Sequence, residues 1–455
     1  MVLLCRNYMG DIMSKYIHEL RDPIHNFIHY NSKEKRAIDS RPIQRLRYIH
    51  QLALTYLVYP GATHKRFEHS LGVMELASRV YDVVTDPNNI LDDSIRDIVP
   101  KSAFEQQYWR QALRMAALFH DAGHLPFSHA VEKELLPDGW NHEKITAEII
   151  CSEEMIKIWN DLKIQTEDVV KLAVGKRHCK DCNFTDWEAI LSEIIVGDAL
   201  GVDRMDYLLR DSHHTGVAYG KFDHYRLIET IRILPKHYND GSKEPALGIE
   251  DGGLHAVEAM LLARYFMYTQ LYFHPVRRIY DIHLKEFLKK WLQDGIFPIE
   301  VENHLQMTDN EVFTGLFEAA RDQNHLGHEY TERREYAERI VNRNHFRLLY
   351  DRNQEDISKN LEAPKAIFNE LCKKFGKKNV RYDTYKQKQR GGDSDFPVYL
   401  NSNRKIVSSL SISNALLEIP IIAINSIYIN LDCRSTATEW LNANRERIIK
   451  PSTEE

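Results

Sequence analysis

The sequence predicts a mainly α-helical fold with a short N-terminal β-hairpin and a smaller, mixed α+β lobe at the C-terminal end. Two observations predict the helices: apolar residues recur at helical spacing over most of residues 34–350, and they form a clear stripe at 71–84. The lobe is predicted because short runs rich in β-branched and aromatic residues replace this spacing after about residue 352. We therefore expect a helical domain, hairpin included, over residues 1–350 and a lobe over residues 351–455.

Each predicted element depends on a local pattern. Residues 16–31 alternate apolar and polar side chains around an Asp-Pro turn signal, which predicts the hairpin. Residues 108–119 form an apolar helical run, and further helical patterns occupy 190–211 and 254–295, where Pro275 is expected to kink or divide the helix. The predicted strands of the lobe are PVYL, KIVSSLSI and SIYINL.

Composition and charge exclude several classes of protein. A chain of 455 residues with 43% hydrophobic residues can bury a large core, and a net charge of −6 with mixed signs creates no global field for nucleic acid or an anionic membrane. Six cysteines in this length do not make a disulfide framework. The N-terminal run resembles no signal peptide, and the longest apolar runs fall short of the roughly 20 residues that span a bilayer. We therefore expect a cytoplasmic protein with no membrane segment.

The central pattern is His69, the adjacent pair His120 and Asp121, and Asp203. An adjacent His and Asp at a helix end can reach one cation or bridge two, and a further imidazole and carboxylate would complete a mixed nitrogen and oxygen shell. Such a shell suits a divalent metal ion, and it does not choose among Mn, Mg, Fe and Zn.

The surroundings of the His-Asp pair decide how it is interpreted. Alone, such a dipeptide is usually a capped helix end with a surface histidine. Here more titratable residues follow within about 22 positions, and packing hardly explains so many directly after an apolar helix. They are His124, His129, Glu132 and His142.

Helical spacing indicates a second group of polar residues. Asp203, Tyr207 and Asp211 lie at i, i+4 and i+8 and share one helix face, with Arg204 beside them. A face of this kind suits a site that grips phosphate and stacks on a sugar or base, and the alternative is a core helix whose tyrosine hydroxyls find ordinary partners. The same spacing recurs on another predicted helix at Arg264, Tyr268 and Tyr272.

Six segments, in sequence order, carry a family resemblance: RDPIHNFIHYN, RPIQRLRYIHQL, YPGATHKRFEHSLGV, LFHDAGHLPFSHAVE, WNHEK and GVDRMDYLLRDSHHTG. Together they resemble the HD-domain deoxynucleoside triphosphate (dNTP) triphosphohydrolases, which include bacterial dGTPases and dNTPases and the SAM-and-HD-domain dNTPase of vertebrates. The resemblance covers roughly residues 16–290, with a weaker echo at 340–350. It implies that residues 1–350 are an HD-type catalytic domain that splits a dNTP into deoxynucleoside and inorganic triphosphate.

The resemblance also implies residue roles at the reacting centre. It makes His69, His120, Asp121 and Asp203 the metal ligands, and it implies that an activated water attacks the α-phosphorus while the 5′-oxygen leaves. The leaving oxygen needs a proton, and an acid relay is implied at His142 and His124, oriented by Glu132. The alternative for these three residues is a hydrogen-bonded cluster that only braces the metal loop.

Substrate contacts are implied in the same way. Phosphate contacts would come from Arg66, His129, Arg204 and Arg264. Sugar and base contacts would come from Gln51, Leu52, Tyr207, Asp211, Tyr268 and Tyr272. Tyr272 would exclude a ribose 2′-hydroxyl. The vertebrate enzymes have His in place of Tyr268 and Lys in place of Arg204, and these differences bear on base selectivity.

A regulatory site is implied as well, because family members assemble as tetramers with activating nucleotides at subunit junctions. We expect a homo-oligomer, a tetramer or a dimer, with dGTP or GTP as effector. The matching positions are Asp39, Gln44, Arg47, Arg343 and Arg347. The alternative for Asp39 and Arg47 is a helix N-cap and an exposed charge.

A cysteine pair and a basic stretch need separate interpretation, and two other functions remain as alternatives to dNTP hydrolysis. The pair Cys179 and Cys182 is expected in a surface loop, and the basic stretch 373–390 is expected to be a solvated loop or an effector contact rather than a site for single-stranded nucleic acid. The alternative functions are an HD phosphohydrolase acting on nucleoside monophosphates or cyclic nucleotides, and a non-enzymatic nucleotide sensor or nucleic-acid-binding HD protein.

Overall fold

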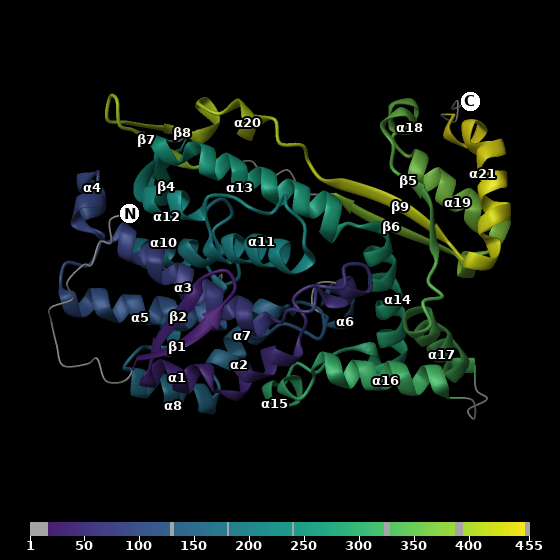
Figure 1. Ribbon diagram of the computed structural model, residues 1–455, viewed down its shortest axis with the longest axis horizontal. Coiled ribbons are helices and arrows are strands. Elements are labelled where there is room, and N and C mark those ends of the chain that lie inside the picture. The colour runs from purple at the N-terminus through teal and green to yellow at the C-terminus, as the bar shows by residue number, and fades with distance from the viewer. Residues whose placement is uncertain are drawn as a thin grey trace.

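The computed structural model describes residues 17–127, 132–179, 182–238, 241–322, 328–386 and 395–450. It confirms the predicted class, because the chain is mainly helical, begins with a small antiparallel hairpin and contains strands in its C-terminal region. Figure 1 shows a helical body from which the long strands β6 and β9 lead to a group of helices near the C-terminus.

The predicted N-terminal hairpin is confirmed. Strands β1 (Ile17–Asp22) and β2 (Asn26–Asn31) pair antiparallel. Asn31 then caps helix α1 (Ser32–Ile38), because its side chain accepts hydrogen bonds from backbone N–H groups of the first turn while the Glu34 carboxylate bonds back to the Asn31 N–H. Ile28 points into the core, so the hairpin is packed against the body.

The long helices of the body form the scaffold of the site. Helices α3 and α5 pack against each other, and the second half of α5, which ends beside His120, is entirely buried. These helices are α3 (Arg66–Val84), α5 (Ala103–Phe119), α7 (His142–Ile150), α9 (Thr166–Val174), α10 (Asp186–Val196) and α11 (Val202–Thr215).

The single helical pattern expected at 190–211 is in fact divided, and that part of the prediction was wrong. Helix α10 ends before Gly197, and α11 begins after Gly201. A Cβ atom on Gly201 would lie 2.5 Å from the Gly197 carbonyl oxygen, so only glycine permits this tight connection. The break places Asp203 in the first turn of α11.

The expected boundary at Pro275 is confirmed. Helix α13 (Leu254–Met267) runs into a π-helical turn at Tyr268–Tyr272, and α14 (Pro275–Trp291) starts at the proline. A π-helical turn is uncommon and often lies at a functional site. Here it carries two of the tyrosines singled out in the sequence.

Two sheets complete the fold. The first has the strand order β3-β4-β7-β8, and the hairpin of β3 and β4 was not predicted. The second has the order β5-β9-β6, so part of the basic stretch expected to be a loop is a strand. The strands are β3 (Ile231–His237), β4 (Lys243–Glu250), β5 (Arg347–Asp351), β6 (Val380–Lys386), β7 (Pro397–Leu400), β8 (Lys405–Ser408) and β9 (Ala423–Ile429).

The remaining helices flank these elements. They are α2 (Arg41–Arg45), α4 (Asp93–Arg96), α6 (Glu132–Leu135), α8 (Glu153–Leu162), α12 (His224–Thr230), α15 (Val301–Leu305), α16 (Asp309–Arg321), α17 (His328–Val341), α18 (Gln354–Lys359), α19 (Ala363–Phe375), α20 (Asn414–Leu417) and α21 (Arg434–Ile449). Among the residues described, no helix combines the length and the apolar composition that a membrane span requires.

Buried residues form one large cluster in the body and a smaller one near the C-terminus. The smaller cluster joins β5, β6 and β9 to α19 and α21. Val398 of β7 belongs to the large cluster, so the chain beyond residue 350 contributes to both, and the domain boundary at 350 stays a prediction. The structure also pairs Cys179 with Cys182 as a disulfide, which the sequence reasoning did not anticipate.

Candidate metal centre and substrate pocket

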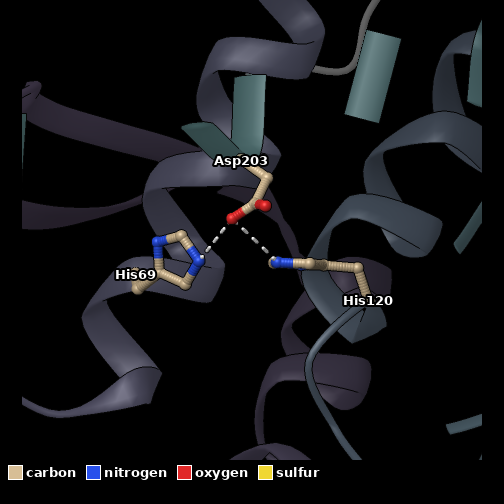
Figure 2. Close-up of side chains that lie close together, drawn as sticks. All are labelled: His69, His120 and Asp203. Carbon is tan, nitrogen blue, oxygen red and sulfur yellow. Dashed lines mark ion pairs between the residues drawn. The ribbon is translucent and has the colours of Figure 1, made fainter. Parts of the chain in front are cut away.

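Three separate elements bring the four predicted ligands together. His69 lies in the first turn of α3, His120 and Asp121 follow the end of α5, and Asp203 begins α11. Figure 2 shows the Asp203 carboxylate between the two imidazole rings. Its Oδ1 atom lies 3.1 Å from His69 Nε2 and 3.5 Å from His120 Nε2, and the Oδ1 atom of Asp121 lies 3.3 Å from His120 Nε2.

Hydrogen bonds on the outer side of each ring turn both Nε2 atoms inward. His120 Nδ1 donates to the Ala117 carbonyl oxygen at 2.8 Å, and His69 Nδ1 donates to Asp206 Oδ2 at 2.8 Å. His120 Nε2 is buried and makes no hydrogen bond with the described residues. A buried nitrogen lone pair beside two carboxylates fits a divalent cation, so these residues suit the expected metal ion.

The pKa values of the predicted ligands also favour a bound cation. Burial raises the pKa of Asp203, but the facing imidazoles of His120 and His69 outweigh it and hold that pKa well below its usual range. Burial lowers the pKa of His69, but Asp203 and Asp206 together raise it to about 10. These shifts show that the two carboxylates favour a positive charge beside them, which a divalent cation would supply.

Arg66, predicted to contact phosphate, lies beside the metal ligand Asp121. It is almost fully buried, and its Nη1 donates to Asp121 Oδ2. A guanidinium at this place contacts the metal-ligand carboxylate and adds positive charge beside the position expected for a phosphate.

The three residues expected to form an acid relay lie close together, and whether they relay a proton stays a prediction. His124 and His142 stack with ring centroids 4.0 Å apart, His124 Nε2 lies 3.2 Å from Asp121 Oδ1, and His142 Nδ1 donates to Glu132 Oε1 at 2.7 Å. Burial and the charges of Arg66 and His142 lower the pKa of His124, whereas for His142 the carboxylate of Glu132 overcomes burial and raises it. The protonated form is therefore favoured at His142 and disfavoured at His124.

A second group of side chains forms around the end of α11. Tyr272 donates its hydroxyl to Asp211 Oδ2 at 2.6 Å, and His64 Nε2 donates to Asp211 Oδ1 at 2.8 Å. Tyr207 and Tyr268 meet the Tyr272 ring edge to face, at 6.3 and 5.0 Å between centroids. Burial raises the pKa of Tyr272 further above its ordinary value, so its hydroxyl stays neutral and donates.

Five more residues were predicted to contact the substrate. Arg204 buries its Nε and Nη1 atoms without a hydrogen-bond partner among the described residues, and the Arg264 guanidinium lies 5.5 Å from the Tyr268 ring centroid. Gln51 likewise buries an unpaired side-chain oxygen next to the buried Leu52. His129 lies outside the described residues.

The predicted effector residues fall into two places. Gln44 accepts a hydrogen bond from Arg47 Nε at 2.8 Å and donates to the Ile38 carbonyl, next to the exposed Asp39. Asp39 is the C-cap of α1 and not an N-cap. Arg347 begins β5, and Arg343 precedes it in the same segment; Figure 1 draws β5 far from α1 and α2. Whether these five residues bind an effector stays a prediction.

The sequence reasoning missed a set of buried polar residues behind the metal ligands. Asp206 and Arg210 lie four residues apart on α11, His25 and Asp22 come from the hairpin turn, and all four are buried. The signal was present, because a carboxylate and an arginine at i and i+4 pair on a helix. The prediction concerned only the face of α11 that carries Asp203, Tyr207 and Asp211, and Asp206 lies on another face.

Two family models match the chain over adjacent ranges. Residues 66–210 match the HD domain, and residues 222–369 match the HD associated region. A solved structure of a hypothetical protein from Aquifex aeolicus is 33% identical, with a TM-score of 0.74, and the alignment covers 93% of this chain and all of that one. The chain therefore belongs to the HD-domain family, within the group whose HD domain is followed by an HD associated region.

Three curated proteins are similar to this chain over much of its length. The uncharacterized protein YwfO of Bacillus subtilis is 29% identical over 88% of both chains. The deoxynucleoside triphosphate triphosphohydrolase SAMHD1 of Gallus gallus is 28% identical over 82% of this chain and 61% of its own length. An uncharacterized protein of Methanocaldococcus jannaschii is 35% identical over 62% of this chain and 51% of its own length. The chain thus spans only half to two thirds of two of these relatives.

The HD domain and the cluster of candidate metal ligands indicate the same general class of enzyme. The HD domain characterises metal-dependent phosphohydrolases, and here it contains groups of His and Asp side chains close enough to hold a metal ion. The protein is a metal-dependent phosphohydrolase of the HD type.

Proposed function

We propose that this protein hydrolyses dNTPs to a deoxynucleoside and inorganic triphosphate. The observation that carries the proposal is that α11 links the metal centre to a hydrogen-bonded group of polar side chains around Asp211 and Tyr272. Asp203 faces the metal ligands at the start of the helix, and Asp211 is paired with Tyr272 two turns later. The names of the SAMHD1 relatives support this choice of substrate.

A triphosphate suits the positive charges between these two points. Arg66 contacts a metal-ligand carboxylate, and Arg204 holds two buried guanidinium nitrogens that make no hydrogen bond within the described chain. A buried donor without a partner is costly, and a phosphate oxygen would relieve that cost. Arg264 adds a third guanidinium beside Tyr268.

The protein side chains would divide the chemistry between them. A divalent cation held by His69, His120, Asp121 and Asp203 supplies positive charge that polarises a water molecule and neutralises phosphate. His142, whose Nδ1 is paired with Glu132, would donate a proton from its other ring nitrogen to the leaving 5′-oxygen, and the stacked His124 would hold that ring in place. Asp211 would accept the 3′-hydroxyl, and the Tyr272 ring would occupy the space of a 2′-hydroxyl.

We further propose that the protein is a homo-oligomer activated by dGTP or GTP at a junction between subunits. Asp39, Gln44 and Arg47 form a polar surface group on one side of the molecule, and Arg343 and Arg347 lie in a distant segment. A site built from both places needs two subunits. Single-particle mass measurements with and without dGTP test this part separately from the chemistry.

The products of the reaction test the substrate proposal. Purified protein with Mn²⁺ is incubated with each dNTP alone and with pairs of dNTPs, and the phosphate products are separated. We expect deoxynucleoside and inorganic triphosphate in equal amounts, and hydrolysis of one dNTP only in the presence of another would reveal activation. Release of phosphate or pyrophosphate instead, or turnover only of monophosphates or cyclic nucleotides, would reject the proposal. Binding of nucleotides without turnover would favour a sensor.

A further inference from the structure

The Asp206 carboxylate lies directly behind the metal ligand His69 and is completely buried. Its Oδ2 accepts hydrogen bonds from His69 Nδ1 and from Arg210 Nε, both at 2.8 Å. Its Oδ1 accepts from His25 Nε2 at 2.7 Å and from Arg210 Nη2 at 2.9 Å. Each oxygen therefore accepts two hydrogen bonds, which fixes both the position and the rotation of the carboxylate.

The surrounding chain is shaped to admit this carboxylate. Gly72 lies on α3 nearly one turn beyond His69, and a Cβ atom there would lie 1.9 Å from Asp206 Oδ1 and 2.5 Å from Arg210 Nη2. No side chain larger than hydrogen fits unless Asp206 moves. The glycine therefore lets α11 approach α3 closely enough for Asp206 to reach the far nitrogen of the His69 ring.

Arg210 is the shared partner of two buried carboxylates in this region. Arg210 lies between Asp206 and Asp22 and donates from Nη1 to Asp22 Oδ2 at 2.8 Å. Asp22 in turn accepts the backbone N–H groups of Ile24 and His25, which closes the hairpin turn. The hairpin turn, α11 and α3 are thus joined by one buried network that ends at His69.

We propose that Asp206 is a positioning residue that orients His69 for metal binding, and that the N-terminal hairpin, through His25 and Asp22, is part of the metal centre's support. This inference rests on the metal centre in the proposed function and not on the identity of the substrate. A carboxylate that accepts the Nδ1 proton of a ligating histidine leaves the Nε2 lone pair for the cation and fixes the ring plane. His120 obtains the same orientation from a backbone carbonyl, so side-chain substitution can test this support only at His69.

Metal affinity tests the proposal without any nucleotide. Mn²⁺ binding to the metal-free full-length protein is measured by calorimetry for the wild type, Asp206→Asn and His25→Ala. Asparagine keeps the size of the side chain but can accept hydrogen bonds at only one of its two terminal atoms. We expect its dissociation constant for Mn²⁺ to rise about 10- to 100-fold, with a smaller rise for His25→Ala.

Glu34→Gln is the matched control. Glu34 is also a buried carboxylate paired with an arginine, Arg114, but it contacts no metal ligand. Its substitution lowers stability in the same way and is expected to leave the Mn²⁺ affinity unchanged. An equal loss of affinity in Glu34→Gln and Asp206→Asn would show a general structural effect and overturn the proposal, as would an unchanged affinity in folded Asp206→Asn.

Amide hydrogen exchange of the wild-type protein tests the same proposal if Asp206→Asn does not fold. Because the network joins His69 to the hairpin turn, Mn²⁺ should slow amide exchange at residues 22–28 as well as around the ligands. His25→Ala should remove the slowing at the turn. If Mn²⁺ binds and the turn exchanges at the same rate with and without it, the hairpin does not support the metal centre. Because no assay here uses a dNTP, a failure of the proposed reaction would leave these results unaffected.

Discussion

At the scale of single residues, the orientation of two imidazole rings determines what the site can bind. His69 and His120 each use Nδ1 as a hydrogen-bond donor on the outer side, and each presents Nε2 to the carboxylates of Asp121 and Asp203. Such a set of nitrogen and oxygen ligands suits a divalent cation. The two rings of the stacked pair differ in pKa. Glu132 overcomes burial and raises the pKa of His142, whereas burial and Arg66 lower the pKa of His124.

Removing one ligand should abolish metal-dependent turnover and preserve the fold. We expect His120→Ala to lose more than about 10³-fold in kcat, the scale on which loss of charge stabilisation acts in a buried site. The variant should also bind less Mn²⁺, measured as metal content after gel filtration. Circular dichroism checks the fold, and a folded His120→Ala with wild-type turnover would remove His120 from the metal centre.

Replacing the sugar-facing tyrosine should alter selectivity more than rate. Tyr272→Ala removes both the ring and the hydroxyl that Asp211 accepts. We expect the ratio of kcat/KM for dNTP over rNTP to fall about 10- to 100-fold, the range over which a pocket discriminates by one small group. Tyr272→Phe separates the two contributions, because it keeps the ring. Unchanged selectivity in Tyr272→Ala would reject the role.

The ligand pattern could be predicted from the sequence because its members lie in recognisable local motifs. His120 and Asp121 follow an apolar helix, and the helical periodicity placed Asp203, Tyr207 and Asp211 on one face. For Asp206, the sequence offers a local signal only for the pairing with Arg210 at i and i+4. Its partners His25 and His69 lie far away in sequence, and no local pattern reports a contact made by folding.

At the scale of elements, the position of Asp203 depends on the break between α10 and α11. The apolar pattern suggested one continuous helix, because periodicity measures which residues are buried and not where the axis turns. The glycines at 197 and 201 were the available signal for a break. The hairpin of β3 and β4 was missed for another reason: Pro235 and Pro245 face each other in it, and proline within a run argues against a strand.

The break can be tested with a matched pair of glycine substitutions at the two ends of α11. Gly201→Ala would place a Cβ atom 2.5 Å from a backbone oxygen and should displace the first turn, which carries Asp203. Gly216→Ala strains a left-handed residue at the other end, where a Cβ atom meets nothing within 4 Å. Each should cost about 1–3 kcal/mol in the free energy of unfolding.

The two variants should differ in metal binding. We expect a weaker Mn²⁺ affinity in Gly201→Ala and an unchanged one in Gly216→Ala, measured by calorimetry beside urea denaturation. Equal Mn²⁺ affinities in the two folded variants would mean that the connection does not set the position of Asp203.

At the scale of the whole molecule, distant parts of the chain are packed into one body. Strand β7 pairs in parallel with β4 although about 150 residues separate them, and Val398 joins the large core. Pairing over such a distance leaves no local trace in the sequence. This is why β7, β8 and β9 could be predicted individually but the division of the C-terminal strands between two sheets could not.

The contact between α10 and β4 predicts a pH dependence of stability. Glu193 accepts the Leu247 N–H at 3.1 Å, and burial raises the pKa of its carboxyl to about 7 from an ordinary value of 4.5. The folded state therefore binds this proton more tightly than the unfolded state does. The protonated Glu193 therefore adds about 3 kcal/mol to the free energy of unfolding. This stabilisation is fully present below about pH 4.5 and is lost as the pH rises through about 7.

Glu193→Gln removes this titration and keeps an acceptor for Leu247. The free energy of unfolding of the variant relative to the wild type should therefore be higher at pH 8 than at pH 5. Urea denaturation at the two pH values measures the difference. A difference between variant and wild type that does not change with pH would show that Glu193 titrates normally in the folded protein.

The central claim is that two imidazoles and two carboxylates from three distant segments hold one divalent cation. Anomalous diffraction from crystals grown with Mn²⁺ tests it most directly. The account predicts a strong anomalous peak within coordination distance of His69 Nε2, His120 Nε2 and the carboxylates of Asp121 and Asp203. A well-ordered crystal with no peak at that position, or with its strongest peak away from these four side chains, would contradict it.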